Sequence, residues 1–172
     1  MEVMEAIKAT RVVAGYKPQP VPEQKLHVVL GAARLAHSVG NMQPWKFMVV
    51  TDEDLKKKLA GACSGGHGFP EAPVVIVACA RMDEAVHAIA GYVNSYPMDL
   101  GAAISLLSVA AAGEGLGTAW IHAFNEEKVK TLLGVPKDDH VVGLTPLGYP
   151  ESFAPPEGRK HLNEIVSYNK FE

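Results

Sequence analysis

The sequence predicts an α+β fold in a single domain spanning residues 1–172. Val74–Ala80 is apolar at every position, which is typical of a central strand covered on both faces. Glu126–Leu133 follows the good N-cap residue Asn125 and precedes Gly134, which predicts a helix with both ends defined. Because helical and strand patterns do not alternate strictly along the chain, α+β is favoured over a doubly wound parallel sheet.

Composition excludes several classes of function. The net charge is −3 and no basic run is interleaved with aromatic residues, so nucleic acid is not an expected partner. The two cysteines make no disulfide framework, and Cys63 with His67 lacks a second ligand pair, so no metal site is expected. The apolar tract Leu100–Ala112 is shorter than the ~20 residues of a membrane span, and the N-terminus carries no apolar signal core. We therefore expect a cytoplasmic protein without membrane segments.

In the first half of the chain, apolar periodicity and turn residues separate the elements. Thr51 and Asp54 form a capping-box pattern before the third expected helix. The connections are expected to be irregular, with a connector at Arg11–Pro22, a loop at His37–Trp45 and a glycine-rich loop at Cys63–Pro70. Helices are expected over Glu2–Ala9, from Pro22 to about Ala36 and over Glu53–Ala62, and a strand over Lys46–Thr51.

In the second half, Met98–Ala112 predicts a helix that is apolar on nearly every side, so it is expected to be buried or to lie in a subunit interface. Asp99, near its start, is interpreted as a carboxylate favoured by the helix dipole. Gly113, Gly115 and Gly117 follow a helix and lack the GxGxxG spacing, so they are not interpreted as a dinucleotide-binding motif. Asp83–Tyr96 is weakly helical, strands are expected over Thr118–Ile121 and His140–Leu147, and no element is assigned to the tail from residue 150.

Four segments, in order along the chain, together resemble the nitroreductase family of flavoproteins. Their order carries the resemblance, because each alone is a weak signal. They are Ala32–Val50 (AARLAHSVGNMQPWKFMVV), Glu71–Ala80 (EAPVVIVACA), Asp99–Phe124 (DLGAAISLLSVAAAGEGLGTAWIHAF), and LGYP at Leu147–Pro150 with RKHLNEIVSYNKF at Arg159–Phe171.

The resemblance implies a three-layer sandwich, with a mostly antiparallel central sheet flanked by helices. It also implies an obligate homodimer with one FMN in each of two interface sites, and a tail of residues 150–172 that packs on the partner subunit. The implied activity is a ping-pong reduction, in which NADH or NADPH is the electron donor and a nitroaromatic, a quinone or a similar small molecule is the acceptor.

Arg11, Arg159 and Lys160 are the candidate ligands of the FMN phosphate, since a dianion calls for basic side chains or backbone N–H groups. The alternative interpretation is solvated charge in loops. Family members usually carry Arg-x-Ser-x-Arg/Lys near the N-terminus, but here Thr10, Val12 and Ala14 occupy those positions and only Arg11 could substitute.

The flavin ring is expected to lie against two other segments. Ser38 and Asn41 match residues that approach the flavin from the second subunit, although both also favour turns. The backbone of His122 and Ala123 matches the strand end that faces the flavin N5, and the His122 side chain is either a donor to flavin or substrate or a bystander. His67 is the candidate beside N1 and O2 of the ring.

Two other functions stay open on the sequence. Because the family's phosphate-binding pattern is incomplete here, the sequence would also suit a dimeric protein that binds flavin or another ligand without reductase activity. Relatives that dehalogenate substrates or fragment flavin carry an extra lid segment, and Met82–Pro97 is the only room for one in this chain.

Overall fold

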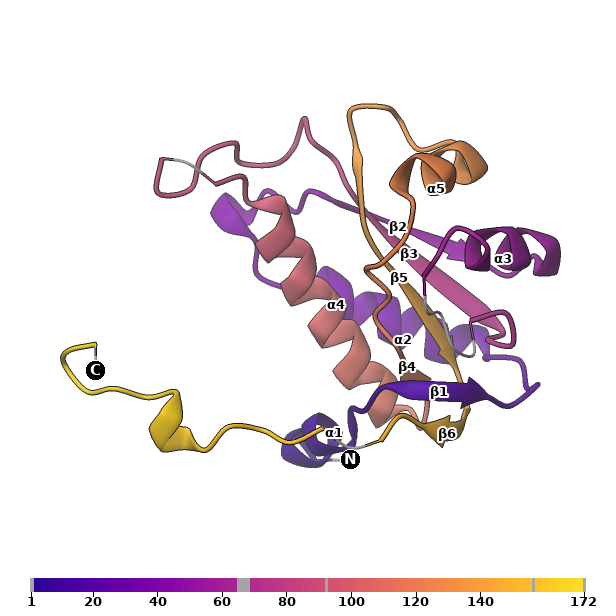
Figure 1. The fold of residues 1–172 in the computed structure, drawn as a ribbon, viewed down its shortest axis with the longest axis horizontal. Coiled ribbons are helices and arrows are strands. Elements are labelled where there is room, and N and C mark those ends of the chain that lie inside the picture. Colours follow the sequence, from indigo (N-terminus) through magenta and orange to yellow (C-terminus); the bar gives the residue numbers. More distant parts are fainter. Residues whose placement is uncertain (1, 65–68, 92, 156, 172) are drawn as a thin grey trace.

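A computed structural model describes residues 2–64, 69–91, 93–155 and 157–171. Its centre is a four-stranded sheet of order β2-β3-β5-β4, in which every pairing is antiparallel (Figure 1). The strands are β2 (Trp45–Val50), β3 (Val74–Ala80), β4 (Gly117–Thr118) and β5 (His140–Gly148). All seven residues of β3 are buried, as its continuous apolar run predicts for an inner strand.

Two helices cover each face of this sheet, which gives three layers (Figure 1). On one face, α2 (Glu23–Arg34) and α4 (Tyr96–Gly113) pack through Val29, Ala33 and Leu107 onto Ile76 and Leu147. On the other face, α3 (Glu53–Ala60) and α5 (Glu126–Leu133) form a second apolar cluster with the sheet. The expected three-layer α+β sandwich with an antiparallel sheet is confirmed.

A small second sheet joins two segments to which the sequence assigned no element. After the short helix α1 (Val3–Ala9), strand β1 (Val13–Tyr16) pairs antiparallel with β6 (Pro150–Phe153). The prediction of a connector over Arg11–Pro22 was therefore wrong where β1 forms, and β6 is an element that the sequence analysis did not assign. Strands this short have little local pattern, and the pairing joins residues far apart in the sequence, so local periodicity gives no sign of it.

Helix ends follow their capping residues. Helix α3 is capped by Asp52, whose carboxylate accepts from the Leu55 N–H at 2.8 Å, and not by Thr51 as expected. Helix α5 has the predicted bounds, with the Asn125 side chain accepting from the Lys128 N–H at 3.0 Å. Gly134 follows with φ of +66°, a left-handed conformation that glycine adopts without strain.

The segment from residue 83 to 95 contains turns and a short bridge instead of the expected weak helix. Ser95 stabilises the end of this segment, because its buried hydroxyl accepts from the Val86 N–H at 3.0 Å. Helix α4 then begins at Tyr96, two residues before the expected start, with Pro97 in its first turn, where the missing N–H is not needed.

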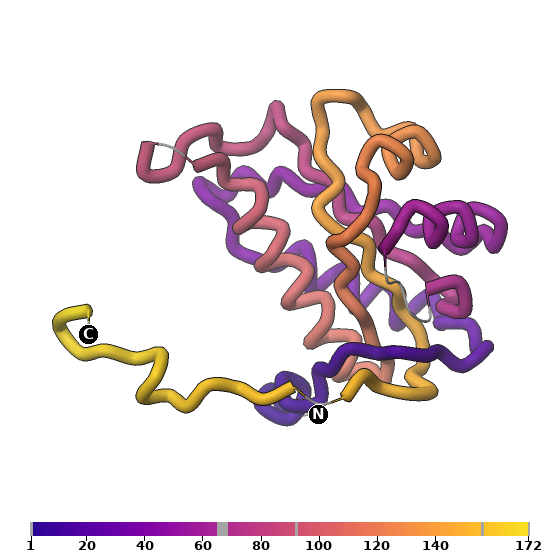
Figure 2. The backbone as a smooth tube through the Cα atoms, viewed as in Figure 1, coloured from indigo at the N-terminus to yellow at the C-terminus, as the bar shows by residue number. Residues whose placement is uncertain are grey.

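Among the described residues, α4 is the one helix that is long and apolar enough to cross a membrane by length and composition. A core helix passes the same test, and the Leu100, Ile104 and Leu107 side chains are buried against the rest of the chain. The cytoplasmic location therefore stays a prediction. Beyond β6 the tail leaves the body of the protein in an extended course, interrupted by one helical turn at Leu162–Glu164 (Figure 2).

Candidate functional site

Arg11 lies between the end of α1 and the end of α4. Its guanidinium stacks over the Phe153 ring at 4.7 Å and donates to the Ala154 carbonyl at 3.4 Å, so β6 sets its position. Beside it is a hollow of about 150 Å³ that Thr10, Gly117 and Thr118 also line. This volume suits a phosphate group and is below the roughly 300–1,000 Å³ of sites that enclose a whole cofactor-sized ligand.

The neighbouring positions add no donor for an anion. The Thr10 hydroxyl donates to the Ala6 carbonyl at 2.8 Å, which uses its proton inside α1. Val12 is exposed and Ala14 is half-buried, and neither side chain can donate a hydrogen bond. Within the stretch of residues 10–14, Arg11 is therefore the sole side chain able to hold a phosphate.

Hydrogen bonds fix the backbone on either side of His122 and Ala123, while the N–H groups of these two residues are available to a ligand. Ile121 exchanges hydrogen bonds with Leu144 of β5 at 2.9 and 3.0 Å, and the Ala123 carbonyl accepts from the Ser64 N–H at 2.7 Å. The N–H groups of His122 and Ala123 donate to no acceptor in the described part of the chain, and both residues are exposed. Two consecutive free donors on a fixed backbone can bind the electronegative edge of a ring.

These free donors lie on the same stretch of chain as the Arg11 hollow. Thr118, which lines the hollow, is four residues before His122, so the two are at most about 14 Å apart along the chain. Between them, Trp120 lies over Gly143, where a Cβ atom would overlap the indole ring. His67, the candidate beside N1 and O2 of the ring, lies outside the described residues.

Ser38 and Asn41 lie in a tight loop that follows α2. The Ser38 hydroxyl accepts from the Gln43 N–H at 2.9 Å, and Gly40, Asn41 and Gln43 have φ between +53° and +61°. The structure places this loop at the start of α4, where Val39 contacts Asp99, whereas Arg11 lies near Ala112 at the other end. Ala112 is thirteen positions after Asp99 in the helix, a rise of roughly 20 Å.

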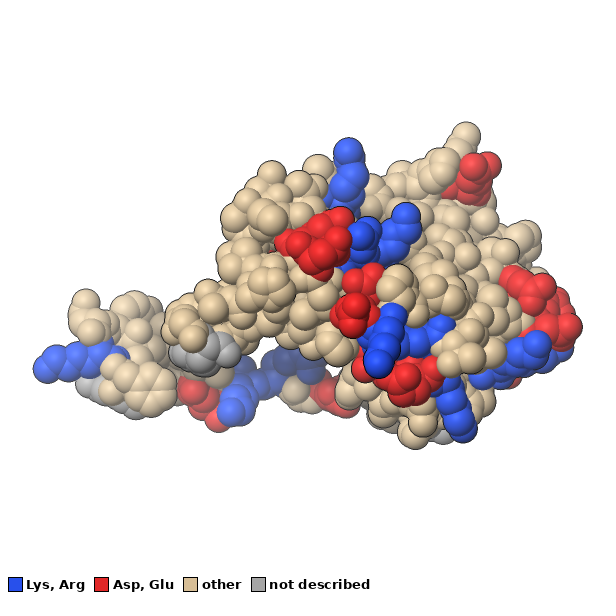
Figure 3. Space-filling model, turned by 90° about the horizontal axis from the view of Figure 1, so that it is seen from above, with Lys and Arg blue, Asp and Glu red and all other residues tan. Residues whose placement is uncertain are grey.

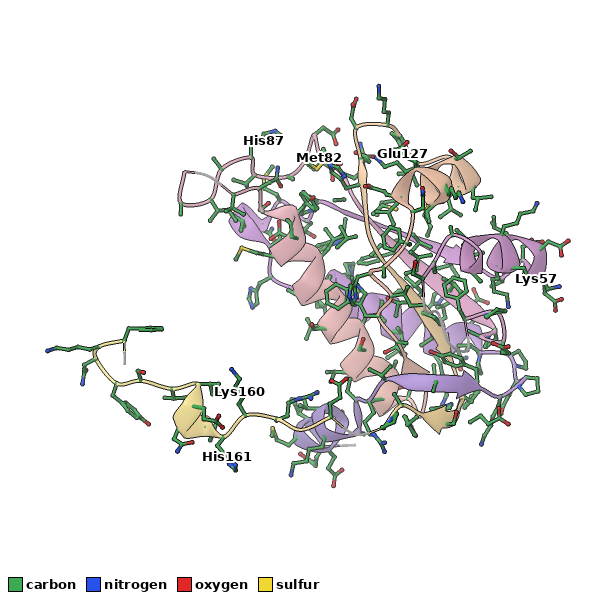
Figure 4. The ribbon with its side chains drawn as sticks, in the orientation of Figure 1. Lys57, Met82, His87, Glu127, Lys160 and His161 are labelled. Carbon is green, nitrogen blue, oxygen red and sulfur yellow. The ribbon has the colours of Figure 1, made fainter. Side chains whose placement is uncertain are left out.

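Arg159 and Lys160 lie on the exposed tail. Among the described residues, Arg159 donates to the Glu157 and Gly158 carbonyls next to it, at 3.4 and 3.2 Å. In Figure 4 the Lys160 and His161 side chains project to opposite sides of the tail. Within one chain, the structure does not bring these two cations to Arg11.

Another cavity lies elsewhere and contains none of the candidate flavin residues. It has a volume of about 520 Å³ and lies between β2, β3 and the end of α5, with Cys79 among its lining residues. Burial raises the pKa of the Cys79 thiol to about 11, so it is protonated at neutral pH and is a poor nucleophile. Basic and acidic side chains are interspersed over the face of the molecule in Figure 3, and Arg81 pairs with Asp83, Glu84 and Asp139.

Comparison with known proteins identifies the family. A model of the nitroreductase family matches residues 7–67 and 64–149. A protein of Archaeoglobus fulgidus, provisionally named NADH dehydrogenase/NAD(P)H nitroreductase, is 32% identical over 159 residues, which cover 87% of this chain and 86% of that protein. The FMN reductase [NAD(P)H] of Bacillus subtilis is 27% identical, over 87% of this chain and 66% of its own length.

Solved structures give the same answer. A nitroreductase family protein from Clostridium novyi superimposes with a TM-score of 0.80 at 33% identity, covering 88% of this chain and 86% of that one. An FMN-dependent nitroreductase from Clostridium difficile superimposes with a TM-score of 0.82 at 25% identity, covering 98% and 99%. The three-layer fold and these matches agree, and the chain belongs to the nitroreductase family.

Proposed function

We propose that the protein is an FMN-dependent NAD(P)H oxidoreductase that works as a homodimer and reduces nitroaromatics, quinones or similar small acceptors. Family membership and the FMN-dependent relatives support a flavin enzyme. The observation that carries the proposal is the pairing, on one stretch of chain, of a cationic hollow sized for phosphate with two free backbone donors. This spacing suits a flavin whose phosphate lies by Arg11 and whose ring lies by His122 and Ala123.

In the proposed dimer, each chain contributes one part to each of two flavin sites. Arg11 and the Ser38–Asn41 loop lie at opposite ends of α4, so they do not enclose one ring together. If two copies of α4 pack antiparallel about a twofold axis, the loop of one copy meets the Arg11 end of the other. Both sites are then completed at the interface, which is the role expected for Ser38 and Asn41.

The outer face of α4 has the composition that such an interface requires. Its less buried residues recur at helical spacing and are all apolar or small, with no charge among them. Met98 is 59% exposed and Leu106 41% exposed. The face consists of Met98, Ala102, Ser105, Leu106, Val109 and Gly113.

The tail is a second element that one chain leaves uncovered. Leu162, Ile165, Tyr168 and Phe171 are between 61% and 102% exposed. Exposed apolar side chains in an extended segment are typical of an arm that docks on another subunit. We therefore place the tail on the partner, where its packing would fix the position of Arg159 and Lys160.

In this arrangement the protein residues bind and orient, while the bound FMN supplies the exchange of hydride and electrons between donor and acceptor. Arg11, with Arg159 and Lys160, binds the phosphate through charge-assisted hydrogen bonds. The N–H groups at His122 and Ala123 hold the ring edge by N5. The His122 side chain is exposed and has no hydrogen bond among the described residues, so we assign it the role of a donor to the acceptor.

The test is to titrate the purified dimer with FMN, record its visible absorption spectrum, and then follow oxidation of NADH and NADPH without oxygen. We expect saturable FMN binding and pyridine nucleotide oxidation that depends on an added quinone or nitroaromatic. Double-reciprocal plots against donor and acceptor should be parallel, as a ping-pong mechanism requires. A folded dimer that binds no FMN at millimolar concentration, with the spectrum of the added flavin unchanged, would overturn the proposal.

The absence of a polar clamp at Thr10, Val12 and Ala14 favours one alternative, a dimeric flavin- or ligand-binding protein of the same fold without reductase activity. Under that alternative FMN, or another ligand, binds, but neither NADH nor NADPH bleaches the bound flavin under anaerobic conditions. The same titration therefore separates the two functions.

A further inference from the structure

Asp99 is a buried carboxylate whose second oxygen is left without a partner. The residue is 2% exposed, and its Oδ1 accepts from the Val39 N–H at 2.9 Å. Its Oδ2 is buried and has no hydrogen-bond partner in the described part of the chain. The first turn of α4 favours a negative charge, but an unpaired buried oxygen destabilises the folded state. General stability therefore does not explain a carboxylate at this position, because an apolar side chain would leave no such atom.

The hydrogen bond from the Val39 N–H to Asp99 differs from the other hydrogen bonds of the Ser38–Gln43 loop. Most other hydrogen bonds of the loop join its own residues, including Gln43 N–H to Ser38 Oγ at 2.9 Å and Asn41 N–H to Ser38 O at 3.0 Å, and the Gln43 carbonyl accepts from the adjoining Trp45 N–H of β2 at 2.8 Å. Among the described residues, Val39 to Asp99 is the one hydrogen bond that joins this loop to α4. The position of the loop relative to α4 therefore depends on Asp99.

The loop also has a reason to move when that bond is removed. Asn41 and Gln43 have φ of +56° and +53°, in the left-handed region that side chains other than glycine adopt reluctantly. Such conformations persist where the surroundings hold them and are relieved when the constraint is lost. Freed from Asp99, the loop would gain conformations in which Ser38 and Asn41 are displaced.

We propose that Asp99 is a positioning residue of the flavin site, which holds Ser38 and Asn41 against α4 in the geometry that meets the flavin ring of the partner subunit's site. The effect on flavin rests on the proposed function, whereas the effect on the loop does not. Because the loop is expected at the ring and not at the phosphate, loss of Asp99 weakens FMN and riboflavin by the same factor.

Three variants test the hydrogen bond from both sides. Asp99→Ala removes the acceptor, and Asp99→Asn keeps an acceptor of the same shape. Val39→Pro removes the donor at the first position of the short helix Val39–Asn41, where proline is tolerated. Ile104→Val, a buried change on the same helix away from the loop, is the control for a general loss of stability.

Two measurements are made on the full-length dimer, namely dissociation constants for FMN and riboflavin, and amide hydrogen exchange over residues 38–43 without flavin. Asp99→Ala should weaken both flavins about tenfold, the loss of roughly one hydrogen bond, and speed exchange in the loop. Asp99→Asn should stay near wild type in both. The double variant Asp99→Ala/Val39→Pro should be no worse than either single variant, because both remove one bond.

Wild-type affinity in folded Asp99→Ala, equal damage in Asp99→Asn, or additive losses in the double variant would each overturn the role of Asp99. An equal loss in Ile104→Val would show that stability alone is responsible. A wild-type protein that binds neither flavin would overturn the proposed function instead, and loop exchange in Asp99→Ala and Asp99→Asn would still decide whether Asp99 holds the loop.

Discussion

The contacts around Arg11 and Glu126 determine the different roles of these two charged residues. Arg11 is held by Phe153 and Ala154 and faces a hollow, so its remaining donors are free for a ligand. The Glu126 carboxylate is used within the fold, where it accepts from the Val141 N–H at 2.9 Å and lies 3.5 Å from the Lys130 ammonium. A change at Arg11 is therefore expected to affect ligand binding, whereas a change at Glu126 is expected to affect the stability of the fold.

Replacing Arg11 by alanine should weaken FMN by about ten- to a hundredfold, because one charged phosphate contact is worth ~1.5–3 kcal/mol. Riboflavin, which has no phosphate, should lose little affinity. Fluorescence titration with both flavins measures this difference, and Lys17→Ala, an exposed cation on the same segment, is the matched control. Equal losses for the two flavins would show that Arg11 does not contact the phosphate.

Glu126 should make stability depend on acid pH. Burial raises the pKa of its carboxyl, but hydrogen bonds from Val141 and His140 and the charge of Lys130 outweigh burial and leave the pKa below its ordinary value. The stabilisation is complete above the unfolded pKa of about 4.3 and is lost as pH falls through the lower folded pKa. Urea unfolding from pH 6 to pH 3 should therefore show a shallower loss of stability in Glu126→Gln than in wild type.

The matched control is Glu127→Gln, since the Glu127 side chain projects from α5 without an ion pair among the described residues (Figure 4). Its pH profile should follow wild type. Identical profiles for wild type and Glu126→Gln would contradict the prediction.

Helix α4 is apolar on nearly all sides because one side packs on the sheet and the opposite side is the proposed subunit interface. One side packs on the sheet through Leu100, Ile104 and Leu107, whose exposed fractions are 1% or less. The opposite side, with Met98 and Leu106, is uncovered in one chain. The sequence prediction that this helix is either buried or in an interface is thus met on the buried side, and the interface stays a prediction for the other.

Leu106→Lys should convert the protein to a folded monomer that has lost its FMN, because a buried, unpaired ammonium at the interface is strongly destabilising. Sedimentation velocity at micromolar concentration gives the mass, and circular dichroism checks the fold. Thr131→Lys, on the exposed side of α5, is the control and should remain dimeric. A dimer of Leu106→Lys with normal FMN content would exclude this face as the interface.

At the scale of the whole molecule, the distribution of the candidate residues makes the dimer itself testable. Arg11 and Asn41 are separated by much of the length of α4 within one chain. Residues brought together across a twofold axis behave differently in a mixed dimer from residues that share a site within one chain. Mixing two variants therefore reports on the assembly and not on either residue alone.

A mixed dimer of Arg11→Ala and Asn41→Ala subunits should contain one site with both residues intact and one site with neither. It should bind one FMN per dimer with wild-type affinity, whereas both parent homodimers bind weakly at both sites. Differently tagged subunits allow the mixed species to be purified for titration. Two equally weakened sites in the mixed dimer would mean that Arg11 and Asn41 belong to the same subunit's site.

The sequence by itself determined the class of fold, the family and most of the main elements. Those elements follow from short-range causes, such as the apolar run of Val74–Ala80 and the caps Asn125 and Gly134. It also named Ser38, Asn41 and His122 as flavin-site candidates through the family segments, and Arg11 as a basic candidate for the phosphate. It placed Asp99 near the start of its own helix, which the structure confirms, but it gave no sign of the hydrogen bond from Val39.

Tertiary structure alone decided the rest. The β1–β6 pairing, the bond from Asp99 to Val39 and the placement of Arg11 and the Ser38 loop at opposite ends of α4 all join residues far apart in sequence. No local pattern encodes such contacts, because they form only when burial of apolar surface across the whole chain compensates the entropy of closing long loops.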